Sequence, residues 1–210
     1  MTQLKRSKIK DLLDGSLTGQ EVLVKGWVRT KRESKNVIFV NLNDGSVIHN
    51  LQVVADPNNH SEDIIKNITT GACIGVVGEL IESFGKGQRV ELSAKDIQII
   101  GEADAEKYPL QPKKHSLEFL REIAHLRPRT NTISAVYRVR HAMIYAIHKF
   151  FNDKGFLNIH TPIITASDAE GAGEMFRVTT LDLENIPKNE NGEIDHNNDF
   201  FGRETNLTVS

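Results

Sequence analysis

The chain has little cysteine, no excess of positive charge and no long hydrophobic run. Cys73 is its only cysteine among 210 residues, which excludes a disulfide within the chain. The eight histidines are scattered, and no Cys/His pair has the spacing of a zinc site. The formal net charge of -2 excludes a broad basic coat, so a polyanionic partner would have to meet a local basic patch.

Membrane and export signals are also missing. No stretch of 18 consecutive apolar residues is present, which argues against a membrane-spanning helix. The N-terminal segment MTQLKRSKIKDLL is basic but has no apolar core, so it is not a secretory signal. We therefore expect a cytoplasmic protein with no membrane partner, long enough for one or two domains.

Strand signals dominate the first hundred residues. Five apolar runs predict five strands, at 22–28, 37–42, 51–55, 72–83 and 89–100. The segment Asn43-Asp44-Gly45-Ser46 predicts a tight turn, because Asp-Gly supplies the positive φ that such a turn needs. A short helix with Ser61 as its N-cap is expected between the third and fourth strands. That order is typical of an OB-fold, a small β-barrel.

Positive charges gather near the end of the first predicted strand, at Lys25, Arg29, Lys31, Arg32 and Lys35. Phe39 and Gln52 fall on the next two strands, and Glu91 falls on the fifth. Cations beside an exposed aromatic ring suit single-stranded nucleic acid, because charge follows the backbone and the ring stacks on a base. The alternative is a solvated hairpin with Phe39 in the core and Glu91 as an ordinary exposed strand residue. The residues alone leave both interpretations open.

The composition changes at 101–114, where charges and two prolines disfavour a packed element. We therefore predict a barrel domain at 1–102, a linker at 103–130 and a second domain at 131–210. Apolar residues at three- and four-residue steps from Ile133 to Phe151 predict a long helix that ends at Gly155. Its apolar stripe would face either its own domain or a second copy of the chain. A strand is expected at 156–160.

The end of the sequence is loop-rich. Glu170 lies in an acidic, glycine-rich loop that suits an ammonium group, and the alternative is an ordinary surface acid in a turn. Residues 182–199 are polar and turn-rich, which predicts an exposed insertion. Asp195, His196 and Asp199 offer cation ligands there, but we expect a solvated loop and no metal site. Residues 206–210 read as a strand cut off at its last residue, so we expect the N-terminal part of a longer protein.

Several segments together resemble the bacterial asparaginyl-tRNA synthetases, a family within the class IIb aminoacyl-tRNA synthetases. The matching stretches cover essentially the whole chain: GWVRTKRESK, REIAHLRPRTN, TPIITASDAEGAGEMF, RVTTLDLENIP and DFFGRETNLTVS. The resemblance implies an α+β protein. A five-stranded OB-fold barrel would precede the start of a class II catalytic domain built on an antiparallel sheet. The OB-fold alone would be a weak argument, because many functions use it.

The resemblance also implies an activity and its partners. A ligase of this family activates asparagine with ATP and Mg²⁺ and transfers it to tRNA(Asn), and it works as a homodimer. The barrel would bind the anticodon, with Phe39 stacked on the central base. The other anticodon contacts would come from Arg29, Gln52 and Glu91.

The same resemblance assigns roles in the second domain. Glu170 would hold the α-ammonium group of asparagine, Ser210 would line the amino-acid pocket, and Pro162 would belong to motif 1 at the dimer interface. The family's ATP-binding arginines belong to motifs 2 and 3, which this sequence does not contain. We therefore expect no catalytic residue, no metal ligand and no adenylation by this chain alone.

Two alternatives remain beside this interpretation. An aspartyl-tRNA synthetase would share the fold and the ammonium contact, although RVTTLDLENIP and LTVS favour asparagine. A non-catalytic OB-fold module that binds tRNA or single strands is the second. The long helix, Pro162 and the acidic loop argue against it, because a binding module has no use for them.

Overall fold

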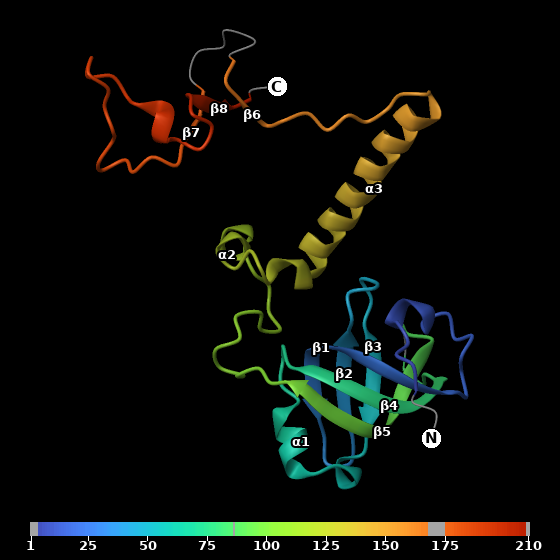
Figure 1. Cartoon of the computed structure of the whole chain (residues 1–210). Helices are drawn as coiled ribbons and strands as arrows, with labels where there is room; N and C mark the ends of the chain where they lie inside the picture. The colour runs from blue at the N-terminus through green and yellow to red at the C-terminus, as the bar shows by residue number, and fades with distance from the viewer. Residues whose placement is uncertain (1–3, 86, 168–174, 209–210) are drawn as a thin grey trace. The chain divides into compact units, whose positions relative to one another are not determined.

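The computed structural model describes residues 4–85, 87–167 and 175–208 (Figure 1). The chain divides into two compact units, Met1–Tyr145 and Ala146–Ser210. The barrel, the linker and the first part of the long helix belong to the first unit. The predicted domain boundaries at residues 102 and 130 stay predictions.

Five strands of the first unit form a closed barrel in the order β1-β2-β3-β5-β4. They are β1 (Glu21–Glu33), β2 (Ile38–Asn43), β3 (Leu51–Ala55), β4 (Cys73–Glu82) and β5 (Val90–Gly101). β3 and β5 pair in parallel, and the other neighbours pair antiparallel. Helix α1 (Glu62–Asn67) joins β3 to β4, and Ser61 accepts a hydrogen bond from the backbone N–H of Ile64. The predicted OB-fold is confirmed, with its helix between the third and fourth strands.

Strand alternation decides which side chains fill the barrel. Ile38, Val40 and Leu42 on β2 are fully buried, so Phe39 and Asn41 lie on the outer face. The 3-10 turn η1 (Ile9–Asp11) adds Ile9 to the same core. Each such aliphatic side chain contributes about 1.5–3 kcal/mol of burial free energy. The core is therefore aliphatic, and the aromatic ring of Phe39 lies outside it.

Three helical elements of the described residues follow the barrel within 117–153. They are α2 (Leu117–Glu122), the 3-10 turn η3 (Arg127–Arg129), which contains Pro128, and the long helix α3 (Asn131–Asp153). Gly155 has φ +84 and ends α3 as predicted, because glycine adopts this left-handed conformation without strain. No residue of α3 is buried, although its stripe is apolar. None of the helices in the described residues is both long and apolar enough to cross a membrane.

The second unit contains a small antiparallel sheet in the order β6-β8-β7. Its strands are β6 (Ile164–Thr165), β7 (Arg177–Val178) and β8 (Thr205–Leu207). The strand predicted at 156–160 is wrong, because these residues form no strand, and Leu157 and Ile159 are 85% and 77% exposed. Apolar sequence alone does not make a strand, since the backbone also needs a partner for its hydrogen bonds. A 3-10 turn, η4 (His196–Asn198), lies in a loop of this unit, and another, η2 (Pro57–Asn59), lies in a loop of the first unit.

Candidate functional site

A row of polar side chains crosses the outer face of the barrel on four neighbouring strands. The register sets Thr30 opposite Asn41, Asn41 opposite Gln52, and Gln52 opposite Glu91. Asn41 Nδ2 donates to Thr30 Oγ1 at 2.8 Å, and Gln52 Nε2 donates to Glu91 Oε2 at 3.2 Å. Amide and carboxylate groups held in this way can hydrogen-bond the edges of bases.

Glu91 is the most enclosed member of this row, at 7% exposed. Its Oε2 atom also accepts from Ser83 Oγ at 3.0 Å and from Gln88 Nε2 at 3.2 Å. Its Oε1 atom accepts no hydrogen bond within the described residues. The carboxylate is therefore oriented through one oxygen, and the other oxygen remains as an acceptor. The alternative of an ordinary exposed strand residue at position 91 is wrong.

Phe39 lies beside the polar row and is half-buried. Arg32 is its partner across β1 and β2, and the guanidinium carbon lies 5.8 Å from the ring centroid. An arginine over an aromatic face is a cation–π contact, and it places positive charge next to a stacking surface. The alternative that places Phe39 in the core is wrong, because Ile38 and Val40 point inward instead.

The structure separates the cations that the sequence places together. The register between β1 and β2 shifts between Val28 and Thr30, so Arg29 is an extra residue in a bulge. Arg29 lines a cavity that Tyr108 and Arg129 also line. Arg32 is the cation that lies on the Phe39 ring, whereas Arg29, an anticodon contact by the family resemblance, lies in the bulge. A bulge leaves no mark in hydrophobic alternation, so only the register shows this.

The ammonium group of Lys31 is bound within the barrel domain and is not free. Its Nζ atom donates to the backbone carbonyl of Ile65 in α1 at 2.7 Å and pairs with Glu33 at 3.0 Å. The first contact holds α1 against β1, and the second lies within β1. Of the positive residues near the end of β1, Lys31 is therefore engaged within the barrel itself.

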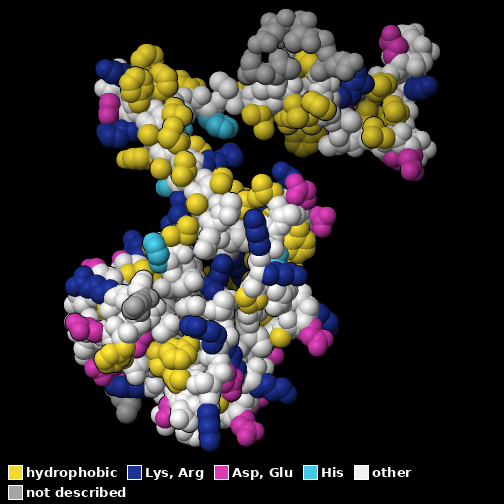
Figure 2. All heavy atoms as spheres, turned by 180° about the vertical axis from the view of Figure 1, so that it is seen from behind, with side chains coloured by type: hydrophobic (Ala, Val, Ile, Leu, Met, Phe, Trp, Pro, Cys, Tyr) yellow, Lys and Arg dark blue, Asp and Glu magenta, His cyan; other side chains and the backbone are white. Residues whose placement is uncertain are grey.

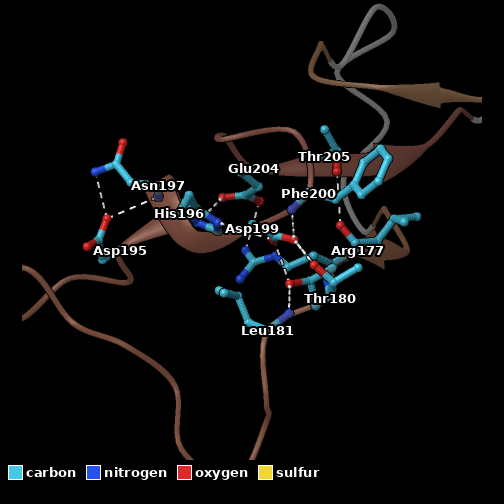
Figure 3. Close-up of polar contacts among 12 residues, drawn as sticks. Arg177, Thr180, Leu181, Asp195, His196, Asn197, Asp199, Phe200, Glu204 and Thr205 are labelled. Carbon is cyan, nitrogen blue, oxygen red and sulfur yellow. Dashed lines mark hydrogen bonds and ion pairs between the residues drawn. The ribbon is translucent and has the colours of Figure 1, made fainter.

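The second unit has its own polar cluster, centred on Asp199 (Figure 3). Asp199 is 8% exposed and accepts from Thr179 Oγ1 at 2.6 Å, from Thr180 N at 2.9 Å and Oγ1 at 3.0 Å, and from Phe200 N at 2.8 Å. These hydrogen bonds, the one from Thr179 first, hold the pKa of Asp199 well below its usual range. The carboxylate thus closes the base of the 182–199 insertion, and the expectation of a solvated Asp199 is wrong.

Replacement of Asp199 by asparagine is expected to loosen the insertion. The neutral amide cannot accept all four hydrogen bonds as the carboxylate does, so limited proteolysis within 182–198 should become several-fold faster. Asp195→Asn is the matched control, because Asp195 only caps the exposed turn η4. Equal cleavage rates for wild type and Asp199→Asn would contradict the assignment.

The depressed pKa of Asp199 also sets the pH range of this contribution. The stabilisation is present above its ordinary value of 3.8 and is lost as the pH falls toward the lower pKa of the folded state. The insertion should therefore loosen only in strong acid.

The remaining predicted site residues are less defined. Glu170 and Ser210 lie outside the described residues. Pro162 is exposed and lies in irregular chain just before β6. Within the described ranges, no group of three or more His, Cys, Asp or Glu side chains is arranged to hold a metal ion.

Two family models match the chain in succession. Residues 22–100 match an OB-fold nucleic acid binding domain, and residues 116–187 match class II tRNA synthetases of the D, K and N type. The asparagine–tRNA ligase of Porphyromonas gingivalis is 59% identical over 208 residues, which cover 99% of this chain and 44% of the relative. That of Cytophaga hutchinsonii is 60% identical over 209 residues, which cover 99% of this chain and 45% of the relative. Nearly the whole chain is therefore homologous to part of these asparagine–tRNA ligases.

Solved structures agree on the fold. Asparaginyl-tRNA synthetase from Pyrococcus horikoshii, complexed with asparaginyl-adenylate, has a TM-score of 0.76 at 20% identity, over 99% of this chain and 43% of that one. A putative aspartyl-tRNA synthetase from Leishmania major has a TM-score of 0.74 at 18% identity, over 100% of this chain and 39% of that one. At such identities the likeness shows the fold and does not separate the two amino acids. The chain spans less than half the length of these curated relatives and solved structures.

Proposed function

We propose that this chain is part of an asparagine–tRNA ligase, which uses ATP and Mg²⁺ to activate asparagine and then transfers it to tRNA(Asn). The observation that carries the proposal is the identity of 59% and 60% with curated ligases across 99% of the chain. We place the enzyme in the cytoplasm. The role of this chain in the reaction is to bind and position tRNA and asparagine.

The outer face of the barrel is the proposed anticodon site. Phe39 would stack on one anticodon base, and Arg32 beside it would attract the neighbouring phosphate. Gln52 and Glu91 would read base edges, because Oε1 of Glu91 is left as an acceptor for an amino group. The arrangement supports recognition of unstacked bases, since ring, cation and oriented acceptor lie on one surface.

Asparagine itself would bind in the second unit. We propose that Glu170 pairs with its α-ammonium group and that Ser210 lines its side-chain pocket. Both assignments rest on the match of the surrounding segments to the family. A carboxylate suits the ammonium group, because charge-assisted hydrogen bonds are about twice as strong as neutral ones.

The substrate distinguishes the proposal from its two alternatives. ATP–pyrophosphate exchange by a ligase that contains this chain should depend on asparagine and not on aspartate. Exchange that depends on aspartate would favour an aspartyl-tRNA synthetase. Binding of tRNA without exchange for either amino acid would favour a non-catalytic module.

Helix α3 and the segment around Pro162 are the proposed homodimer interface. Figure 2 shows hydrophobic side chains exposed along α3, whereas charges of both signs are mixed over the barrel. Met143, Ile147 and Phe150 are each more than half exposed on this helix. Apolar side chains at this density are costly in water and mark an interface.

The proposed dimer predicts that a charge in the apolar stripe of α3 halves the mass of the particle in solution. The chain should sediment as a dimer, and Ile147→Asp should give a monomer, because it places a charge inside the apolar stripe. Ala142→Asp is the control, since position 142 falls on the opposite side of the helix. A wild-type chain that stays monomeric at high micromolar concentration would contradict the proposal.

A further inference from the structure

Two cavities meet beside the bulge of β1. The first, about 470 Å³, is lined by Arg29, Arg129, Lys113, Lys114 and His115 among others. The second, about 490 Å³, shares Arg29 and Arg129 with it and adds His125, Arg138 and His141. None of the described residues that line either cavity is an aspartate or a glutamate. The chain as a whole carries a formal charge of -2, so this concentration of positive charge is local.

One of the two arginines at the centre, Arg129, is held by neutral groups. Arg129 stacks over Trp27 at 4.7 Å from the ring centroid, and its Nη1 atom donates to Tyr108 Oη at 3.2 Å. Tyr108 is itself fixed, because its ring lies 2.7 Å from where a Cβ of Gly71 would be, and Gly71 has φ +94. The position of the Arg129 guanidinium is therefore set without a carboxylate.

Among the described residues, no carboxylate forms an ion pair with either arginine. Burial lowers the pKa of Arg29, and the smaller effects of Tyr108 and Arg129 oppose each other. A half-buried cation beside a second cation opposes folding unless an anion joins them. The pair is thus prepared for an anionic ligand.

We infer that the cavity at Arg29 and Arg129 binds a backbone phosphate of tRNA. Guanidinium groups match phosphate oxygens with paired hydrogen bonds, and the lysines at 113 and 114 would add further charge. The inference rests on the proposed function, because it takes tRNA to be the ligand. In this inference Arg29 positions the tRNA, whereas Phe39, Gln52 and Glu91 on the outer barrel face contact its bases.

The cavity adjoins the outer barrel face that carries Phe39 and Gln52, which favours RNA over a free nucleotide as its ligand. Thr30 lines the first cavity and also accepts from Asn41 in the polar row. A strand whose bases lie on Phe39 and Gln52 would therefore pass the mouth of the cavity. Phosphates beside the bases fix the register of a bound strand, whereas base contacts give specificity.

The test compares tRNA(Asn) with a transcript changed only in its anticodon. Arg29→Met should weaken the binding of both RNAs by the same factor, roughly ten-fold. It should also reduce the slope of log K against log salt by about 0.7–0.9, the value for one phosphate contact. Lys66→Met on α1 is the matched control, because it removes one exposed charge outside both cavities.

Several outcomes would overturn the inference. Unchanged tRNA affinity would do so, and a loss confined to the cognate anticodon would make Arg29 a base-reading residue. A titration with ATP tests the other source of phosphate. Tight ATP binding that Arg29→Met abolishes, with tRNA affinity unchanged, would assign the cavity to a free nucleotide.

The thermal stability of Arg29→Met distinguishes a role of Arg29 in phosphate binding from a structural role. Because no carboxylate of the described residues pairs with Arg29, Arg29→Met should unfold at the same temperature as wild type or higher. A clear fall in Tm would instead show that Arg29 holds the fold together.

The proposed function can fail independently of this inference. A chain that shows no anticodon preference, but loses affinity uniformly with Arg29→Met, would keep the phosphate site and lose the anticodon site.

Discussion

Replacement of Phe39 by alanine is expected to weaken binding of the tRNA(Asn) anticodon stem-loop roughly ten-fold, because base–aromatic stacking is worth about 1–3 kcal/mol. Phe39 lies on the outer face, and the core below it is aliphatic, so the barrel should keep its structure. Fluorescence anisotropy with a labelled stem-loop measures the change directly.

Two controls define this result. Phe39→Tyr keeps a ring and should bind nearly as tightly as wild type. Thermal unfolding of Phe39→Ala should match wild type closely, which excludes loss of the fold as the cause. Equal affinities of wild type and Phe39→Ala for the stem-loop would remove Phe39 from the site.

The second large effect is expected at Glu170. In a ligase that contains this chain, Glu170→Gln should lower kcat/KM for asparagine in pyrophosphate exchange by roughly ten- to a hundred-fold, because a neutral amide cannot complement the α-ammonium charge. The KM for ATP should stay the same, since the lost contact is to the amino acid.

Glu174→Gln is the matched control, because it removes the same charge from the same loop four residues away. If Glu170→Gln left kcat/KM for asparagine unchanged, Glu170 would not be the ammonium ligand. If both variants lost activity equally, the loop charge in general would matter and not one carboxylate.

The barrel could be predicted from the sequence because its strands and its helix have local sequence signals. Alternation in β2 separates buried Ile38 and Val40 from the outer Phe39, and Ser61 marks the start of α1. The sequence alone does not decide whether Phe39 lies in the core or on the surface. Only closure of the barrel shows that aliphatic side chains fill the core and leave the ring outside.

The arginines show where alternation fails. The bulge at Arg29 shifts the later residues of β1 by one position relative to β2, so Arg32 and not Arg29 lies on Phe39. The cavity at Arg29 needs Tyr108 and Arg129 from the linker, which are distant in sequence. The sequence of the first strand alone therefore predicts neither the bulge nor the cavity.

The second unit departs further from the sequence prediction. The apolar segment 156–160 predicts a strand, but a strand forms only where another backbone supplies hydrogen bonds. Asp199 shows the opposite case, because a polar, turn-rich segment hides a carboxylate that Thr179 and Thr180 enclose. Residues far apart in the chain decide both outcomes.

We propose that the barrel face recognises the asparagine anticodon, and one competition experiment tests this proposal most directly. The chain is titrated with tRNA(Asn) and with transcripts that differ from it only in the three anticodon nucleotides, at one fixed salt concentration. Each wrong base is expected to cost about 1–3 kcal/mol, so tRNA(Asn) should bind at least roughly ten-fold more tightly than the changed transcripts. Equal affinity for all of these transcripts would contradict the account.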